Sequence, residues 1–342
     1  RDRTGCKAQR NDSTMKVMLA SEYYPPYIGG VQRQIQQLAG ELTARGHDVS
    51  VATIWSPGSP AFEAAPWPVY RLRQLRTAVE RWTRPGKKHA APGPDPITVA
   101  AMRTALRRER PDVVHTYGWI SYSVAAAVQG TSTPVVLSAR DYAQGCATRT
   151  LVAHGELCSG PSPRRCLACT VDHFGAVNGP IALAGTWASS KLLIPRICGL
   201  HSVSTYVRDS VRELWLDDRA RGIPHEVIPS FMSDAEFDDA DDDPALEPYL
   251  RLLPDEPFIA FAGALRGVKG VGVLLNAYEG LSSPPPLVLI GTRERETPRS
   301  LPPGVTIAPD FPHGAVMAAW RRSLFGVAPS LWPEPLGSVV YE

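Results

Sequence analysis

The stretch Val327-Ala-Pro-Ser-Leu-Trp-Pro-Glu-Pro-Leu-Gly-Ser-Val-Val-Tyr-Glu342 decides the fold of this sequence. The apolar run 324–328 predicts a short buried strand, and residues 338–342 predict the start of a helix. A strand that leads through a loop into a helix start is where α/β proteins bind anions, because amide N–H groups point outward there. Glu334 and Glu342 flank the loop, and carboxylates accept hydrogen bonds from hydroxyls. The stretch therefore predicts a site for a ligand with phosphate and hydroxyl groups, such as a sugar nucleotide.

Length and composition are those of a folded protein with two ordinary domains. The 342 residues are 44% hydrophobic and 20% charged, which is typical of a globular chain and excludes a disordered one. No apolar run approaches the roughly 20 residues of a membrane-spanning helix, and residues 1–14 lack the apolar segment of a signal peptide. We therefore expect a cytoplasmic protein whose first fourteen residues are disordered or a non-native leader.

Charge is unevenly distributed along the chain. Residues 71–110 hold eleven Lys or Arg against three acids, whereas residues 234–247 hold eight acids and no base. Such runs are most often solvated faces or linkers. The sharper interpretation of the basic run is a patch that faces anionic lipid headgroups at the inner face of a membrane. No nucleic-acid partner is expected, because few aromatic residues are interleaved with the bases. Asp239-Ala-Asp241 has the spacing of a metal motif but lies inside the acidic run, so we expect no metal there.

The beginning of the chain has the pattern of a doubly wound α/β sheet. Residues 17–20 predict a buried strand, residues 31–42 an amphipathic helix, and residues 47–53 a second strand. Gly29 and Gly30 precede the helix, and glycine lets the backbone come close to a ligand. A plain turn is the alternative. A nicotinamide cofactor is disfavoured, because only this glycine pair stands in place of Gly-x-Gly-x-x-Gly.

Two further strands end near side chains that can take part in chemistry. The strand predicted at 111–116 contains His115, and the strand predicted at 133–138 leads to Arg140 and Asp141. A lone histidine at a strand end is more often structural than catalytic. Arg140 stays cationic near neutral pH, so it cannot act as a base, but it can hold a phosphate or a carboxylate.

Four cysteines follow within 24 residues, in the pattern C-x11-C-x7-C-x2-C: Cys146, Cys158, Cys166 and Cys169. In a cytosolic protein, clustered cysteines suggest a metal more readily than disulfides. Four thiolates suit a closed tetrahedral zinc site, which would fold a segment rich in loops. Reduced thiols without metal, disulfides and an iron–sulfur cluster are the alternatives.

The last third of the chain predicts a second sheet with its own anion site. A strand at 258–262 leads into Gly263-Ala-Leu-Arg-Gly-Val-Lys-Gly270 and a helix. Arg266 and Lys269 stand three residues apart at the helix start, so both can face one anion. The alternative, two surface bases that bind no anion, is disfavoured because the positive end of the helix dipole repels cations at a helix start. The loop therefore predicts a clamp for a diphosphate. Further strands and a helix are predicted at 287–291, 305–308 and 314–322.

The run at 334–342, Glu-Pro-Leu-Gly-Ser-Val-Val-Tyr-Glu, resembles the Glu-x7-Glu signature of the retaining glycosyltransferases of family four. The segment 263–270 and the pair Gly29-Gly30 resemble segments of the same family in the same order. The resemblance implies the GT-B fold, in which two Rossmann-like doubly wound domains face a cleft. It implies an N-terminal acceptor-side domain at 15–230 with a cysteine-rich insert and helices at 143–197, an acidic linker at 231–256, and a nucleotide-sugar-binding domain at 257–342 that we expect to be truncated.

The resemblance also implies roles for individual residues. The catalytic set would be Arg266 and Lys269, which neutralise the leaving diphosphate, and Glu334, which binds a sugar hydroxyl. The donor would be held by Gly29, Gly30, Gly263, Leu336, Gly337, Ser338 and Glu342. The acceptor or leaving-group side would include His115, Arg140 and Asp141. Arg140 stands where relatives commonly have histidine, which leaves the acceptor class open.

The resemblance implies a nucleoside diphosphate sugar as donor, a glycan or lipid-linked alcohol as acceptor, and no cofactor for catalysis. Cell-envelope polysaccharide or glycolipid synthesis is the expected setting. Two alternatives remain: a non-catalytic protein that binds nucleotide sugars, and a nucleotide-sugar epimerase with the GT-B fold.

Overall fold

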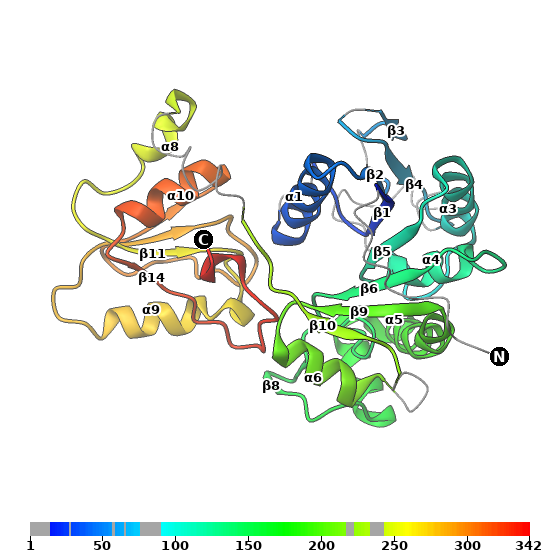
Figure 1. Ribbon diagram of the computed structural model, residues 1–342. Coiled ribbons are helices and arrows are strands. Elements are labelled where there is room, and N and C mark those ends of the chain that lie inside the picture. The colour runs from blue at the N-terminus through cyan, green and yellow to red at the C-terminus, as the bar shows by residue number, and fades with distance from the viewer. Residues whose placement is uncertain are drawn as a thin grey trace. The chain divides into compact units, whose positions relative to one another are not determined.

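The computed structural model describes residues 14–26, 29–56, 59–64, 66–75, 90–216, 222–232 and 243–342. The chain divides into two compact units, Arg1–Ser230 and Phe231–Glu342, and each is built around its own sheet (Figure 1). The predicted α/β class with two parallel sheets is confirmed. Four expectations fall wholly or partly outside the described residues: the leader, much of the basic run, most of the acidic run 234–247, and Asp239-Ala-Asp241.

The first unit contains an eight-stranded sheet with the order β10-β9-β6-β5-β1-β2-β4-β3. Its pairs are parallel except for β3 with β4. The strands are β1 (Lys16–Ser21), β2 (Asp48–Ile54), β3 (Phe62–Glu63), β4 (Val69–Leu72), β5 (Val113–Tyr117), β6 (Val135–Ala139), β9 (Ile197–Ser202) and β10 (His225–Val227). A separate hairpin pairs β7 (Val152–Ala153) with β8 (Glu156–Leu157).

The position of β1 in this order creates a switch point. The chain leaves β1 for β2 on one side and later places β5 on its other side. At such a reversal, the loops after the two strands diverge and leave a crevice at the carboxyl edge of the sheet, where α/β proteins bind ligands. The two loops that border this crevice begin at Glu22, after β1, and at Gly118, after β5.

Helices cover both faces of the first sheet (Figure 1). Side chains alternate along a strand, so Leu19 of β1 joins Ile35 in one buried cluster and Met18 joins Met102 in another. Ile35 belongs to α1 (Gly30–Ala44) and Met102 to α3 (Pro96–Glu109). The other helical segments among the described residues of this unit are α4 (Ile120–Ala127), α5 (Pro163–Leu193), η1 (Ile194–Arg196) and α6 (Thr205–Leu214).

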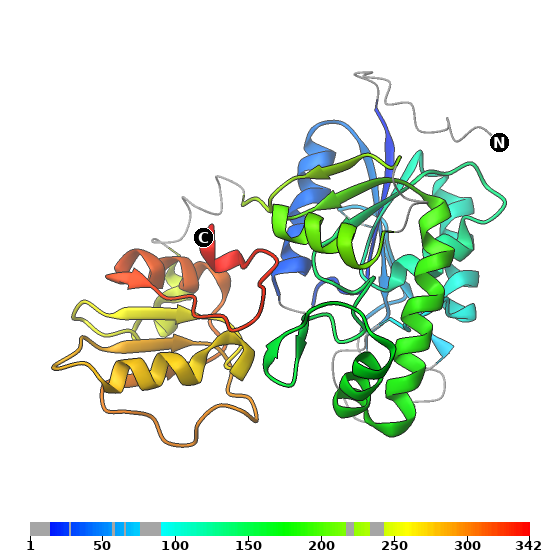
Figure 2. The same cartoon turned by 90° about the horizontal axis from the view of Figure 1, so that it is seen from below.

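The segment α5 is two helices joined at Gly175. This residue has φ 85° and ψ 167°, which is not helical, and the chain folds back there. Figure 2 shows the short first half beside the start of the longer second half. The halves touch at Gly179, where a Cβ atom would lie 2.6 Å from the backbone of Thr170.

We expect Gly175→Ala to lower the free energy of unfolding by about 1–3 kcal/mol, because only glycine adopts this backbone conformation at low cost. A Cβ at Gly175 would meet nothing within 4 Å, so the loss would come from the backbone alone. Gly272, the second residue of α9 (Val271–Glu279), is the matched control, since its Cβ would also meet nothing within 4 Å and alanine has a higher helix propensity than glycine. Urea denaturation should show opposite signs for the two variants, and equal effects would contradict this explanation.

The second unit contains a four-stranded parallel sheet with the order β13-β12-β11-β14. The strands are β11 (Ile259–Ala262), β12 (Leu287–Ile290), β13 (Val305–Ala308) and β14 (Phe325–Gly326). The chain steps from β11 to β12 and β13 on one side and then returns to β14 on the other, so a second switch point lies between β11 and β14. One face packs on α9 (Val271–Glu279), and the other on η3 (Pro244–Leu246), α8 (Glu247–Leu250) and α10 (His313–Arg322).

One sequence prediction is wrong in this unit. The run 324–328 was expected to be a buried strand, but β14 has two residues and the side chain of Phe325 is 54% exposed. In the described sheet β14 is the edge strand and pairs with β11 alone. The apolar pattern therefore reported strand pairing and not burial.

Candidate active site

The loop after β11 is the centre of the candidate site in the second unit. It runs from Gly263 through the single turn η4 (Gly267–Lys269) to Gly270, after which α9 begins. Gly270 has φ 75°, and a Cβ there would lie 1.9 Å from the carbonyl oxygen of Pro329. The glycine thus lets the segment that follows β14 lie directly against this loop, at the switch point.

Lys269 and Glu334 form an ion pair between these two segments. The Lys269 Nζ lies 2.8 Å and 2.6 Å from the two carboxylate oxygens of Glu334. The carboxylate also accepts hydrogen bonds from Ser330 Oγ at 2.9 Å and from Trp332 Nε1 at 2.8 Å. The lysine and glutamate side chains are 29% and 23% exposed, so the pair is held firmly but stays within reach of a ligand.

Arg266 has a different partner in the same loop region. Its Nε donates to Glu294 Oε2 at 2.7 Å, and Glu296 Oε2 accepts from the amide of Gly267 at 2.7 Å. Glu294 and Glu296 follow β12, and the sequence analysis did not single them out, although two acids directly after a predicted strand were a usable signal. Arg266 and Lys269 therefore each bind a separate carboxylate in this structure. That both bind one anion together stays a prediction.

The nine-residue motif ends in one helical turn. The predicted helix start is the 3-10 turn η5 (Ser338–Val340), which Gly337 precedes. Leu336, Gly337 and Ser338 therefore lie between Glu334 and this turn. The Glu342 side chain is 4% exposed, and its Oε1 lies 3.4 Å from His313 Nε2.

A buried acid occupies the switch point of the first unit. Glu22 directly follows β1, and its side chain is only 3% exposed. Its carboxylate accepts hydrogen bonds from the amide of Trp119, after β5, and from Arg149 Nη2 at 2.9 Å and 3.0 Å. Gly118 has φ 68°, and a Cβ there would lie 2.4 Å from the same carboxylate, so glycine makes room for it.

Arg149 belongs to the cysteine-rich insert and inserts its guanidinium into this edge of the sheet. The guanidinium carbon lies 4.1 Å from the centroid of the Trp119 ring, and Nη1 lies 3.9 Å from Asp141 Oδ2. Burial opposes the positive charge, but Glu22 and Asp141 outweigh it and raise the pKa of Arg149 above its ordinary value. Sequence reasoning missed Glu22 and Arg149, because they lie 127 positions apart and no local pattern shows their contact.

The other residues predicted for the first unit, the donor-side pair Gly29-Gly30 and the acceptor-side residues, lie along the same sheet. Gly29 and Gly30 form the start of α1, and Gly29 has an extended backbone. Asp141 Oδ1 accepts from the amide of Ala143 at 2.9 Å. Arg140 Nη2 donates to Ser230 Oγ, which fixes the guanidinium near the end of β10.

His115 is held inside the first unit. Its Nδ1 lies 3.1 Å from the hydroxyl of Tyr117, and its ring centroid lies 5.9 Å from that of His201. Burial, with smaller effects from His201 and Arg140, lowers the pKa of His115 to about 3. The ring is therefore neutral near pH 7, which favours the structural interpretation of this residue.

Acid should destabilise the first unit through His115. The folded-state pKa of about 3 lies below the ordinary value of 6.5, so the unfolded chain binds more protons and stability falls as pH drops below about 6.5. We expect a loss of about 2 kcal/mol in the free energy of unfolding between pH 7 and pH 5.

Urea denaturation across this pH range would measure the loss. His115→Gln should flatten the pH dependence partly, since burial also lowers the pKa values of His201 and His225. Replacement of the exposed His154 is the control. An unchanged slope in His115→Gln would contradict the assignment.

The fold and the two switch-point sites define a GT-B glycosyltransferase. Residues 28–230 match the family model described as Glycosyltransferase Family 4, which is more than half of the chain. The chain therefore belongs to Glycosyltransferase Family 4 and transfers a sugar from a nucleotide sugar. No described helix is long and apolar enough to span a bilayer.

Solved structures with low sequence identity have the same fold. Sucrose-phosphate synthase from Thermosynechococcus elongatus is 18% identical with a TM-score of 0.66, over 95% of this chain and 77% of the other. HepE from Anabaena in complex with UDP-glucose is 13% identical with a TM-score of 0.58, over 95% and 77%. WaaG, a glycosyltransferase involved in lipopolysaccharide biosynthesis, is 14% identical with a TM-score of 0.53, over 92% and 75%. A comparison with curated proteins found no match.

Proposed function

We propose that this protein is a retaining glycosyltransferase that moves a sugar from a nucleoside diphosphate sugar to an acceptor alcohol. The observation that carries the proposal is the Lys269–Glu334 pair, which joins the loops after β11 and β14 at the switch point of the second unit. The HepE complex with UDP-glucose supports a donor of this class.

The pair suggests how the donor is held. A diphosphate beside Lys269 competes with Glu334 for the ammonium group, and the released carboxylate oxygen can accept a hydrogen bond from a sugar hydroxyl. Arg266 is 54% exposed and can leave Glu294 to reach the same diphosphate. Cations placed where negative charge develops on the leaving group lower the barrier to transfer. Glu342 would bind the ribose hydroxyls, assisted by backbone amides near Gly337.

Retention needs no protein nucleophile in this proposal. The acceptor hydroxyl attacks the anomeric carbon from the side on which the diphosphate leaves, and a diphosphate oxygen takes the hydroxyl proton. The bond from the anomeric carbon to the diphosphate breaks as the new glycosidic bond forms. Asp141 and Arg140, at the carboxyl edge of the first sheet, would form the acceptor side. Gly29 and Gly30 would let the backbone come close to the donor phosphates.

A thermal-shift panel of nucleoside diphosphates and their sugars, without added metal, tests the donor clamp. We expect nucleotides with one particular nucleobase to raise Tm. This increase should be lost in Lys269→Ala and weakened in Arg266→Ala. Lys191→Ala removes an exposed cation of the first unit and should keep the shift. An equal shift in Lys269→Ala would overturn the clamp. A folded protein with no shift for any donor would favour the non-catalytic alternative, and epimerised donor formed without acceptor would favour the epimerase.

We further propose that the acceptor is a glycan or lipid-linked alcohol of the cell envelope, reached from the cytoplasmic face of a membrane. The involvement of WaaG in lipopolysaccharide biosynthesis supports this setting. Part of the basic run supports it as well, because Arg103, Arg107 and Arg108 are exposed on α3. Arg71 does not contribute, since its side chain is buried against Glu63.

Binding to anionic vesicles tests the membrane part of this proposal. Each arginine near such a surface contributes about 1 kcal/mol, and salt screens the attraction. We expect binding that weakens with salt and in a variant with Arg103, Arg107 and Arg108 replaced by glutamine. Salt-independent binding, or no binding, would overturn the proposal.

A further inference from the structure

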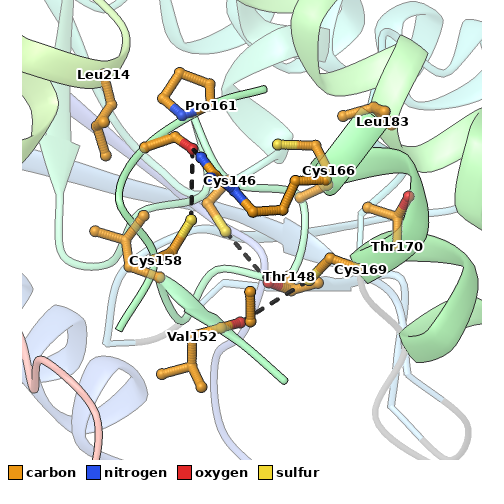
Figure 3. Close-up of a pocket in the computed structure, with 16 residues that line it drawn as sticks. Cys146, Thr148, Val152, Cys158, Pro161, Cys166, Cys169, Thr170, Leu183 and Leu214 are labelled. Carbon is orange, nitrogen blue, oxygen red and sulfur yellow. Dashed lines mark hydrogen bonds between the residues drawn. The ribbon is translucent and has the colours of Figure 1, made fainter. Parts of the chain in front are cut away.

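Four cysteines from separate parts of the insert line one pocket of the first unit (Figure 3). Cys146 lies in the loop after β6, Cys158 directly follows β8, and Cys166 and Cys169 lie in the first turns of α5. Apolar side chains, among them Leu183, complete the lining. Folding has thus gathered residues that are 23 positions apart in the sequence around one point.

The size of the pocket restricts what it can hold. Its volume is about 30 Å³, which is space for one or two water-sized groups. Pockets for drug-sized ligands have volumes of about 300 Å³ or more. A sugar or a nucleotide is therefore excluded from this pocket, whereas a single ion fits.

The sulfur atoms are free thiols with weak polar partners. Cys146 Sγ lies 3.2 Å from Thr148 Oγ1, Cys158 Sγ lies 3.5 Å from the carbonyl oxygen of Gly160, and Cys166 Sγ accepts from the amide of Ser162 at 3.3 Å. In this arrangement, no three His, Cys, Asp or Glu side chains of the described residues form a metal-ligand set. Coordination would require the thiols to turn toward the centre of the pocket that they already line.

Arg165 also lines the pocket, and its buried Nε has no hydrogen-bond partner among the described residues. A thiolate sulfur would supply that acceptor.

We propose that this pocket is a structural zinc site with Cys146, Cys158, Cys166 and Cys169 as its ligands. Four thiolates are a common ligand set of structural Zn²⁺, which prefers a tetrahedral arrangement of sulfur. On binding, the four thiols lose four protons to solvent and form four Zn–S bonds, with no change in oxidation state. The complex carries a charge of −2, and Arg165 offsets part of it.

The site would control the position of Arg149. This residue lies between the first two cysteines and reaches Glu22 at the switch point of the sheet. Arg149, Leu151 and His154 of the same loop all have positive φ, at 65°, 51° and 53°. A loop with three such residues needs fixed ends to keep its conformation. Zinc bound to Cys146 and Cys158 would hold both ends of this loop in place.

Metal analysis of the full chain, purified without chelator, tests the proposal. We expect one zinc per chain by plasma mass spectrometry, and strong sulfur-to-cobalt charge-transfer and tetrahedral d–d bands when Co²⁺ replaces the zinc. Cys166→Ser and Cys169→Ser should lose both the bound zinc and the cobalt absorption bands. Cys198→Ser, which removes a thiol on β9 away from the pocket, should keep both. An insoluble variant does not block the test, because chelation of the wild-type protein should expose the four thiols to alkylation.

Three results would overturn the proposal. The first is protein that, once reduced, takes up neither Zn²⁺ nor Co²⁺. The second is iron and sulfide with the visible absorption of an iron–sulfur cluster. The third is a mass, after alkylation, that shows these cysteines joined in disulfides.

Discussion

Lys269→Ala is expected to lower kcat/KM for sugar transfer by about 10²–10³-fold and to leave the fold intact. Removal of one charged donor that stabilises developing negative charge typically costs this much in rate. The ammonium group is held at the switch point by Glu334 before any donor arrives, so it is already in place for the leaving diphosphate. The pair is partly exposed, so its loss should cost about 1 kcal/mol of stability or less.

Transfer rates with saturating and limiting donor, measured beside thermal unfolding, check this prediction. Glu334→Gln tests the partner, since it keeps the hydrogen bonds possible but removes the charge that orients Lys269. We expect the kcat/KM of Glu334→Gln to lie between that of the wild type and that of Lys269→Ala. Lys191→Ala controls for the loss of an exposed lysine. A loss of less than tenfold in Lys269→Ala, with unchanged thermal unfolding, would show that this lysine does not stabilise the leaving group.

The sequence predicted the regular elements of the sheets closely. The strand expected at 305–308 is β13, and the helix expected at 31–42 lies within α1. Both rest on local patterns of apolar residues, which report the period of the backbone. The α5 hairpin was not delimited in the same way, because its turn depends on the φ of Gly175 and on the close approach of Gly179 to Thr170. Neither feature produces a periodic signal.

The candidate site was predictable where one short segment contains it. The loop with Arg266 and Lys269 and the motif with Glu334 are each local, and the structure brings Lys269 and Glu334 into direct contact. Two acids after a predicted strand were a local signal for Glu294 and Glu296. Their contacts with Arg266 and the Gly267 amide were not predictable, since the acids and the loop follow different strands. The parallel order of the sheet, which brings the carboxyl ends of strands together, is what unites them.

Glu22→Ala should be the most destabilising single substitution proposed for the first unit. It leaves Arg149, whose side chain is 15% exposed, without its main countercharge at the edge of the sheet. Removal of one partner from a buried ion pair typically costs about 3–5 kcal/mol, because the remaining charge stays buried and uncompensated. For a unit of this size, that is a fall of roughly 6–20 °C in Tm. Arg149→Met should cost less, since Glu22 keeps the hydrogen bond from the Trp119 amide.

The double variant separates a loss of charge balance from a loss of packing. Glu22→Leu combined with Arg149→Met removes both charges and keeps apolar volume over the Trp119 ring, so it should be more stable than Glu22→Ala. A double-mutant cycle of Glu22→Leu, Arg149→Met and the double variant, measured by urea denaturation, gives the coupling between the two positions, which should exceed about 1 kcal/mol for residues in contact. Additive effects would show that the two side chains contribute independently. If coupling is strong and the double variant is stable but inactive, the ion pair serves to place the insert beside the acceptor, because stability alone would then not require the charges.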